Sequence, residues 1–262
     1  MNIMTNAEQF QAQLHQYVPV FTADYWPVWL ILAGLAFVGM LAVLGFHALL
    51  RALFAKKQPD DGHEEKVYLY SAAIRTWHWC NAALFLMLLF SGLINHFALT
   101  SASAMATLVG LHKACGILFI ISWVGFLLVN IFGGNGHHYI VKPQGYTDRA
   151  MKQVRFYLFG IIKGEDHPFP ATQQSKFNPL QQVAYVAVMF GLVPLLIITG
   201  LLALYPQLLA GGLAFLKPWI VIIHFALAII GLFFVVGHLY LCTTGKTFTQ
   251  TFKSMFDGYH RH

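Results

Sequence analysis

Six histidines lie inside strongly apolar stretches of the sequence, where a polar ring is unexpected, and four of them can be matched in depth. The chain has 13 histidines, and these four are His78, His112, His224 and His238. An imidazole at membrane depth costs free energy unless its ring nitrogens have partners. Such a ring either hydrogen-bonds a Ser, a Thr or a backbone carbonyl of a neighbouring helix, or it ligates a metal ion. The chemistry open to these four residues is therefore packing or metal ligation.

The spacing of these histidines favours ligation. His224 and His238 are 14 residues apart, which on one helix separates them by about 21 Å along the axis and by only about 40° around it. If neighbouring helices alternate in direction, His78 falls level with His238, and His112 falls level with His224. Imidazoles from two facing helices are a common way for a bundle to hold haem iron. The pattern predicts two bis-histidine haem sites, one near each membrane surface.

One further histidine competes for a place in this arrangement. His96 follows His78 by 18 residues on the same apolar stretch, so it returns to the same helix face at the outer surface. We prefer His112 as the outer ligand because it belongs to a different stretch, whereas His96 lies at the end of its own. Gly231, midway between the last two histidines, would let a macrocycle approach the backbone, although glycines in membrane helices more often serve plain packing.

The other polar residues near these stretches allow two interpretations each. Arg75 and Lys113 stand beside two of the histidines, where they would either pair with haem propionates or act as interfacial anchors. His47 has no partner at its depth, which favours packing or snorkelling. His137 and His138 are adjacent in a loop, where they are either a metal-binding pair or simply solvated.

Five apolar stretches would position these residues. The chain has 262 residues, of which 58% are hydrophobic and 10% charged, with a mean hydropathy of +0.62. The stretches contain no Asp or Glu and span residues 27–50, 76–97, 108–132, 183–204 and 218–242. Each is long enough to cross a bilayer as a helix. The sequence predicts an all-α integral membrane bundle, with a first helix and cytoplasmic linker in residues 1–66 and a four-helix domain in residues 67–262.

The distribution of basic residues predicts the orientation. Of the 16 Lys and Arg residues, only Lys113 and Lys217 fall on the side that carries the amino terminus. Since such residues stay on the cytoplasmic side, we expect a bacterial inner-membrane protein with a periplasmic amino terminus and a cytoplasmic carboxyl terminus. The long connection 133–182 would then be cytoplasmic, with a short helix near 148–160. The net charge of +6 is scattered over loops, which argues against a nucleic-acid partner.

Three motifs around the histidines carry a family resemblance. They are Arg75-Thr-Trp-His78-Trp-Cys-Asn81, Leu111-His112-Lys-Ala-Cys-Gly116, and Ile223-His224 followed by Gly237-His238-Leu-Tyr240. Over about residues 67–260 the chain resembles the membrane cytochrome b subunits of respiratory formate dehydrogenases, NiFe hydrogenases and thiosulfate reductases. The resemblance implies two haem b groups, one held by His78 with His238 and the other by His112 with His224.

The segment 176–185 looks like the quinone-pocket segment of that family. The resemblance implies that menaquinone or ubiquinone binds near Asn178, Gln181 and His238 on the cytoplasmic side. The same residues also suit a helix start, with Asn178 as the N-cap and Pro179 at the first position. The two interpretations are compatible.

The family resemblance implies an electron-transfer subunit with no catalytic residue of its own. It would link the quinone pool to a periplasmic iron–sulfur subunit and a catalytic subunit. The chain departs from formate dehydrogenase subunits in two ways: it has Leu180 where they tend to have Gly, and it has an added first helix. Both features resemble the thiosulfate reductase branch more closely. The alternatives are a stand-alone cytochrome b561-type oxidoreductase and, in another class, a transporter whose histidines relay protons. The three cysteines form no CxxC or CxxCH motif, so covalent haem attachment is unsupported.

Overall fold

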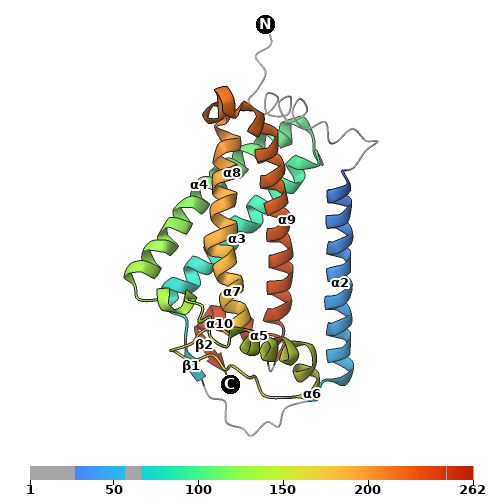
Figure 1. Ribbon diagram of the computed structural model, residues 1–262, viewed down its shortest axis with the longest axis vertical. Coiled ribbons are helices and arrows are strands. Elements are labelled where there is room, and N and C mark those ends of the chain that lie inside the picture. Colours follow the sequence, from blue (N-terminus) through green and yellow to red (C-terminus); the bar gives the residue numbers. More distant parts are fainter. Residues whose placement is uncertain (1–26, 57–65, 246, 262) are drawn as a thin grey trace. The chain divides into compact units, whose positions relative to one another are not determined.

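The computed structural model describes residues 27–56, 66–245 and 247–261, most of which are helical. Five helical stretches in this part of the chain are long and apolar enough to cross a membrane (Figure 1). They are α2 (Val28–Phe54), α3 (Ala72–His96), α4 (Ala102–Phe132), the run of α7, η3 and α8 (Pro179–Leu204), and the run of η5 and α9 (Gly211–Cys242). The predicted all-α membrane fold with five transmembrane helices is confirmed.

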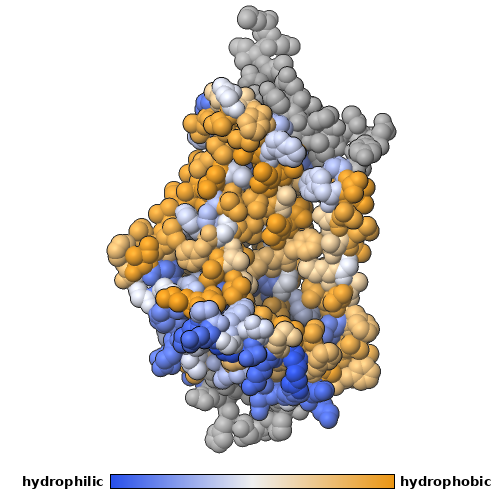
Figure 2. Space-filling model, in the orientation of Figure 1, coloured by the Kyte–Doolittle hydropathy of each residue, from blue (hydrophilic) through white to orange (hydrophobic). Residues whose placement is uncertain are grey.

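Large apolar side chains cover the outer faces of these helices. Only 6% of the most apolar window of α2 and 17% of that of α4 are buried inside the protein. Figure 2 shows hydrophobic residues along both helices. So much exposed apolar surface would be unstable in water, but it is matched by hydrocarbon, in which helices satisfy their own backbone groups.

Local sequence signals fix where several helices begin. Ser71 Oγ accepts the Ile74 N–H at the start of α3, and Ser101 Oγ accepts the Ala104 N–H at the start of α4. At the start of α7 (Pro179–Ala187), Asn178 and Gln181 form a capping box, with Pro179 at the first position. The predicted cap at Asn178 is confirmed.

Two π-helical turns interrupt otherwise regular helices. The turn η3 (Val188–Leu192) precedes α8 (Val193–Leu204), in which Pro194 has no N–H to donate to the preceding turn. The other is η2 (Phe156–Gly160), between α5 (Tyr146–Arg155) and α6 (Ile161–Lys163). The short helix predicted near 148–160 is therefore present and extends beyond both predicted ends.

The chain divides into two compact units, and each spanning helix contributes to both. Unit 1 contains the described residues up to Leu35 together with Trp79–Phe126 and Gly191–Phe233. Its short elements are η4 (Pro206–Leu209) and η5 (Gly211–Leu216), which precede α9 (Lys217–Cys242). Unit 2 contains the described residues of Ala36–His78, Leu127–Phe190 and Phe234–His262. It includes η1 (Gly136–Tyr139) and α5 to α7, and hydrophilic residues gather around α5 in Figure 2.

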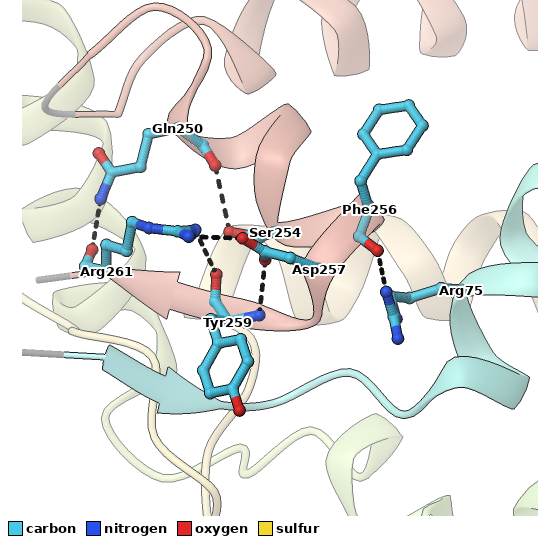
Figure 3. A network of polar contacts seen from close by, with 7 residues as sticks. All are labelled: Arg75, Gln250, Ser254, Phe256, Asp257, Tyr259 and Arg261. Carbon is cyan, nitrogen blue, oxygen red and sulfur yellow. Dashed lines mark hydrogen bonds and ion pairs between the residues drawn. The ribbon is translucent and has the colours of Figure 1, made fainter.

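A small polar structure at the carboxyl end of unit 2 was not predicted. Strand β1 (Lys66–Tyr68) pairs antiparallel with β2 (Tyr259–Arg261), and Val67 lies opposite His260. The strand β2 follows α10 (Gln250–Asp257). Figure 3 shows Arg261 facing Asp257, with Nη2 2.5 Å from Oδ2. The Arg261 guanidinium holds the pKa of Asp257 below its ordinary value.

Gly258, which joins α10 to β2, has a positive φ and closely packed neighbours. Its φ is +88°, and an added Cβ would lie 2.5 Å from the Tyr70 carbonyl oxygen. The Gly258 carbonyl also accepts the N–H groups of Leu69 and Tyr70. Only glycine meets all of these requirements without displacing the β1 segment.

We expect Gly258→Ala to lower the thermal unfolding temperature of the detergent-solubilised protein. The matched control is Gly134→Ala, because Gly134 has a φ of +73° but open space around a Cβ. Backbone strain alone costs about 1 kcal/mol, and the collision at Gly258 raises the cost to about 3 kcal/mol or more. Equal melting temperatures for the two variants would contradict this account.

Candidate functional site

The four apolar histidines form two facing pairs, one in each unit. In unit 1 the ring centroids of His112 on α4 and His224 on α9 are 6.4 Å apart. In unit 2 those of His78 on α3 and His238 on α9 are 6.3 Å apart. Two imidazoles that share a metal ion have centroids about 6 Å apart, because each nitrogen lies about 2 Å from the metal. Both pairs therefore have the separation of axial ligands.

In unit 1 the second nitrogen of each ring is occupied by a hydroxyl. Nδ1 of His112 is 2.9 Å from Ser91 Oγ, and Nδ1 of His224 is 2.9 Å from Thr199 Oγ1. Partners of this kind orient a metal-binding histidine and set its tautomer. They leave Nε2 of each ring for a ligand.

The pair in unit 2 has different neighbours. Phe234 stacks on the His238 ring with an interplanar angle of 17°. The Tyr185 ring lies 6.4 Å from the same imidazole, centroid to centroid. Cys242 Sγ lies 3.8 Å from His238 Nε2. His238 thus has two aromatic rings and a thiol as neighbours.

The donor set fits haem better than a fully protein-bound metal ion. Among residues 27–56, 66–245 and 247–261 there is no group of three or more His, Cys, Asp or Glu that could hold a metal. Structural zinc takes four protein ligands. Haem iron takes four ligands from the porphyrin and two axial ones from the protein, which is what each pair offers.

The competing histidine and the central glycine have other contacts. His96 stacks on Phe225, with ring centroids 3.5 Å apart and an interplanar angle of 12°. At Gly231 a Cβ would lie 2.7 Å from the Phe85 ring. This contact with Phe85 favours the packing interpretation of Gly231 over the approach of a macrocycle. The choice of His112 over His96 stays a prediction, and the ring contacts favour it.

Two basic residues that flank the histidines remain candidates for propionate binding. Arg75 Nη1 donates to the carbonyl of Phe256, near the carboxyl end of α10 (Figure 3). Lys113 follows His112 on α4 and is half-buried. The contact of Arg75 shows that its guanidinium is at least partly used to hold the C-terminal segment.

The predicted quinone residues Asn178 and Gln181 are mostly engaged with each other. Asn178 Oδ1 accepts the Gln181 N–H at 2.9 Å, and Gln181 Oε1 accepts the Asn178 N–H at 3.1 Å. Asn178 Nδ2 donates to the Tyr157 hydroxyl at 2.8 Å. The Tyr157 oxygen is therefore an acceptor, which leaves its own proton for another partner.

A cluster of tyrosines links this segment to His238, and sequence reasoning missed it. Tyr185, which faces His238, interacts electrostatically with three other phenols and a thiol, those of Tyr70, Tyr139, Tyr157 and Cys242. The phenols come from four separate segments of the chain, so no spacing in the sequence could have indicated them. We call Tyr70, Tyr139, Tyr157 and Tyr185 the tyrosine cluster.

Burial keeps these phenols protonated. It raises the pKa of Tyr70 and that of Tyr139 to about 12, with smaller effects from Cys242 and Tyr70 respectively. Burial also raises the pKa of Tyr157, although hydrogen bonds from Asn178 and Gln153 oppose the rise. At neutral pH these three groups are hydrogen-bond donors rather than bases.

Gln153 extends this polar region away from the tyrosine cluster. Its side chain is fully buried, and Nε2 lies 3.3 Å from Nε2 of His167. The Gln153 Oε1 atom has no hydrogen-bond partner within the described part of the chain. A continuous set of polar groups therefore runs from His167 through Gln153 and Tyr157 to Asn178.

The adjacent histidines of the long connection differ from each other. His137 is exposed and its Nδ1 contacts the Gly134 carbonyl at 2.7 Å, whereas His138 is only 7% exposed. The expectation that both are solvated is wrong for His138. Burial, with smaller effects from His137 and Lys176, lowers the pKa of His138 to about 4.

Five apolar helices that hold facing histidine pairs define a membrane cytochrome of the b type. Comparison with known sequences agrees: the model of the prokaryotic cytochrome b561 family matches residues 69–258, and the chain belongs to that family. It is 62% identical, over the full length of both chains, to the Escherichia coli (strain K12) protein named "Putative cytochrome YdhU". No solved structure matches the chain.

Family membership fixes the general chemistry of this protein. Proteins of the cytochrome b561 family bind haem b and transport electrons. With five helices able to span a bilayer, the chain fits a multi-pass protein of the prokaryotic inner membrane. The family match leaves α2 outside its bounds.

The buried His138 predicts a pH-dependent stability. The pKa of His138 is about 4 in the folded chain rather than 6.5. As the pH falls below 6.5, this side chain therefore binds a proton in the unfolded chain but not in the folded chain. Stability is retained above pH 6.5 and falls by up to about 3 kcal/mol as the pH drops toward 4. Melting temperatures across this range should depend less on pH in His138→Gln, while the exposed-site control His137→Gln keeps most of the dependence.

Proposed function

We propose that this protein is a di-haem cytochrome b subunit that anchors a respiratory oxidoreductase in the membrane and exchanges electrons with quinone. The observation that carries the proposal is the pair of imidazole separations, 6.4 Å in unit 1 and 6.3 Å in unit 2. One unbroken helix, α9, supplies a histidine to each pair. Two matched sites on one helix are hard to attribute to packing alone.

The residues of each pair would act as axial ligands through a ring nitrogen. When bound, haem b supplies one-electron redox chemistry, and the protein supplies ligands, spacing and surroundings. Ser91 and Thr199 hold the rings of unit 1 by Nδ1. Arg75 and Lys113 are the proposed partners of propionates, in addition to the contact that Arg75 makes with α10.

The quinone site is proposed in unit 2, beside His238. Asn178 and Gln181 shape it through their capping box, which uses Oε1 of Gln181 and leaves its Nε2 as a proposed donor to the quinone. The Tyr157 hydroxyl, whose oxygen already accepts a hydrogen bond from Asn178 Nδ2, is the proposed donor to a quinone carbonyl. Oxidation of a quinol releases two electrons and two protons, and reduction of a quinone takes up the same. The set of polar groups from Tyr157 to His167 offers protons a route.

The partner is proposed to be an iron–sulfur subunit with a catalytic subunit, docked on the periplasmic side. This side follows from the scarcity of Lys and Arg in the loops there. A stand-alone cytochrome b561-type oxidoreductase is the alternative. Purification from the native membrane in mild detergent distinguishes them, because an iron–sulfur partner accompanies the chain only under the first proposal.

The ligand assignment predicts the haem content of single variants. We expect two haems per chain in the parent protein and about one in each of His112→Ala, His224→Ala, His78→Ala and His238→Ala, because iron with one axial imidazole is weakly held. The matched control is His96→Ala, which removes an imidazole of the same helix bundle and should retain both haems. Haem is counted from reduced-minus-oxidised spectra against protein concentration.

Two results would contradict this assignment. Unchanged haem content in the His224→Ala and His238→Ala variants would exclude α9 as the shared ligand helix. Loss of one haem in His96→Ala, with none lost in His112→Ala, would show that His96 and not His112 ligates the outer haem.

The proposed quinone site predicts a kinetic effect of one hydroxyl. Tyr157→Phe removes the group that would donate to the quinone, so quinol-driven haem reduction should slow by about tenfold or more. Haem content and spectra should be unchanged. The control is Tyr146→Phe, since that hydroxyl only reaches the Pro179 carbonyl at 3.5 Å. Stopped-flow reduction by a water-soluble menaquinol analogue provides the rate, and equal rates in both variants would exclude Tyr157 from the site.

A further inference from the structure

The histidine pair of unit 1 is supported by a short motif that occurs twice. On α3 the residues are Ser91-Gly-Leu-Ile94, and on α8 they are Thr199-Gly-Leu-Leu202. In each copy a hydroxyl residue precedes a glycine, and both contact the histidine of another helix. Ser91 and Gly92 contact His112, and Thr199 and Gly200 contact His224.

The two copies have nearly identical geometry. The distance from hydroxyl oxygen to Nδ1 is 2.9 Å in both. A Cβ at Gly92 would lie 3.2 Å from Cε1 of His112, and one at Gly200 would lie 3.2 Å from Cε1 of His224. Ser91 is 3% exposed and Thr199 is 6% exposed. The absence of a side chain at the glycine leaves space for the imidazole ring, and the neighbouring hydroxyl forms a hydrogen bond with Nδ1 of that ring.

The direction of these hydrogen bonds follows from a count of protons. Ser91 Oγ donates to the Met87 carbonyl at 2.6 Å, and Thr199 Oγ1 donates to the Leu195 carbonyl at 2.7 Å. A hydroxyl has one proton, and in each case the backbone already takes it. The hydroxyl oxygen must therefore accept the Nδ1–H of the histidine. Both rings are thereby fixed as the tautomer with a free electron pair on Nε2.

We propose that Ser91 and Thr199 are positioning residues that set the redox potential of the haem in unit 1. The inference rests on the proposed ligation by His112 and His224. An acceptor on Nδ1–H increases the basicity of an imidazole ligand, which stabilises ferric relative to ferrous iron. Because both axial ligands carry such an acceptor, the two effects add. In unit 2, His238 has the Cys242 thiol as a neighbour instead of this motif.

The test is a potentiometric titration of the haem-loaded full chain in detergent. Ser91→Ala and Thr199→Val each remove one acceptor, and valine keeps the shape of threonine. Each variant should shift the oxidised-to-reduced equilibrium of one haem toward the reduced form by about threefold to tenfold, or about 30 to 60 mV upward. The same haem should shift in both variants, and the double variant should shift about as much as the two together.

The controls separate tuning from a general effect on packing. The haem of unit 2 is an internal reference and should keep its potential. Ser122→Ala removes another hydroxyl of unit 1, one that contacts Asn81 Oδ1 at 3.3 Å, and should shift neither haem. Ser91→Thr and Thr199→Ser retain the acceptor, so they should retain the parent potential. These two swaps also keep the test informative if removal of a hydroxyl releases the haem.

The outcomes distinguish this inference from the proposed function. Two bound haems with unshifted potentials in Ser91→Ala and Thr199→Val would overturn the tuning role and leave the ligands intact. Shifts as large in the hydroxyl-retaining swaps as in the deletions would overturn it as well. Absence of haem from the parent chain would instead overturn the proposed function.

Discussion

An imidazole surrounded by apolar helices needs a partner for each ring nitrogen, and much of this structure serves that requirement. In unit 1 one nitrogen of His112 and of His224 is met by a hydroxyl. The ring centroids of this pair lie 6.4 Å apart, close to the separation of two imidazoles that share a metal ion. The glycines beside the hydroxyls let each ring lie against a neighbouring backbone. Helix spacing, small residues and hydroxyl positions are thus consequences of one constraint.

The helix α2 adds polar contacts that the family match does not cover. His47 contacts the Tyr240 hydroxyl and, at 3.3 Å, the Leu158 carbonyl. Arg51 Nη2 donates to the Thr243 carbonyl at 2.7 Å. Besides the expected packing role, His47 makes specific polar contacts. They connect α2 to the end of α9 and to the π-helical turn η2. That turn also carries Tyr157, so α2 contacts an element of the proposed quinone site.

What the sequence could predict depended on whether the signal was local. The spans were predictable because hydropathy is read along one helix, and the cap at Asn178 because its partner is three residues away. The pairing of His78 with His238 was inferred from depth alone, and the centroids of their rings lie 6.3 Å apart. The tyrosine cluster, the burial of His138 and the β1–β2 pairing were missed because their partners are distant in sequence. Ser91 and Thr199 were missed for the same reason, although each is followed by a glycine.

The two units differ in whether the hydroxyl protons near their histidines are already used in hydrogen bonds. In unit 1 the hydroxyl protons beside the histidines are committed to the Met87 and Leu195 carbonyls. These two hydroxyls would therefore supply no proton to a haem bound there as proposed. In unit 2 the Tyr157 oxygen accepts a hydrogen bond while its proton remains available, and polar groups lead on to His167. Under the proposed function, Tyr157 beside the proposed quinone site therefore offers a proton for exchange, whereas Ser91 and Thr199 of unit 1 do not.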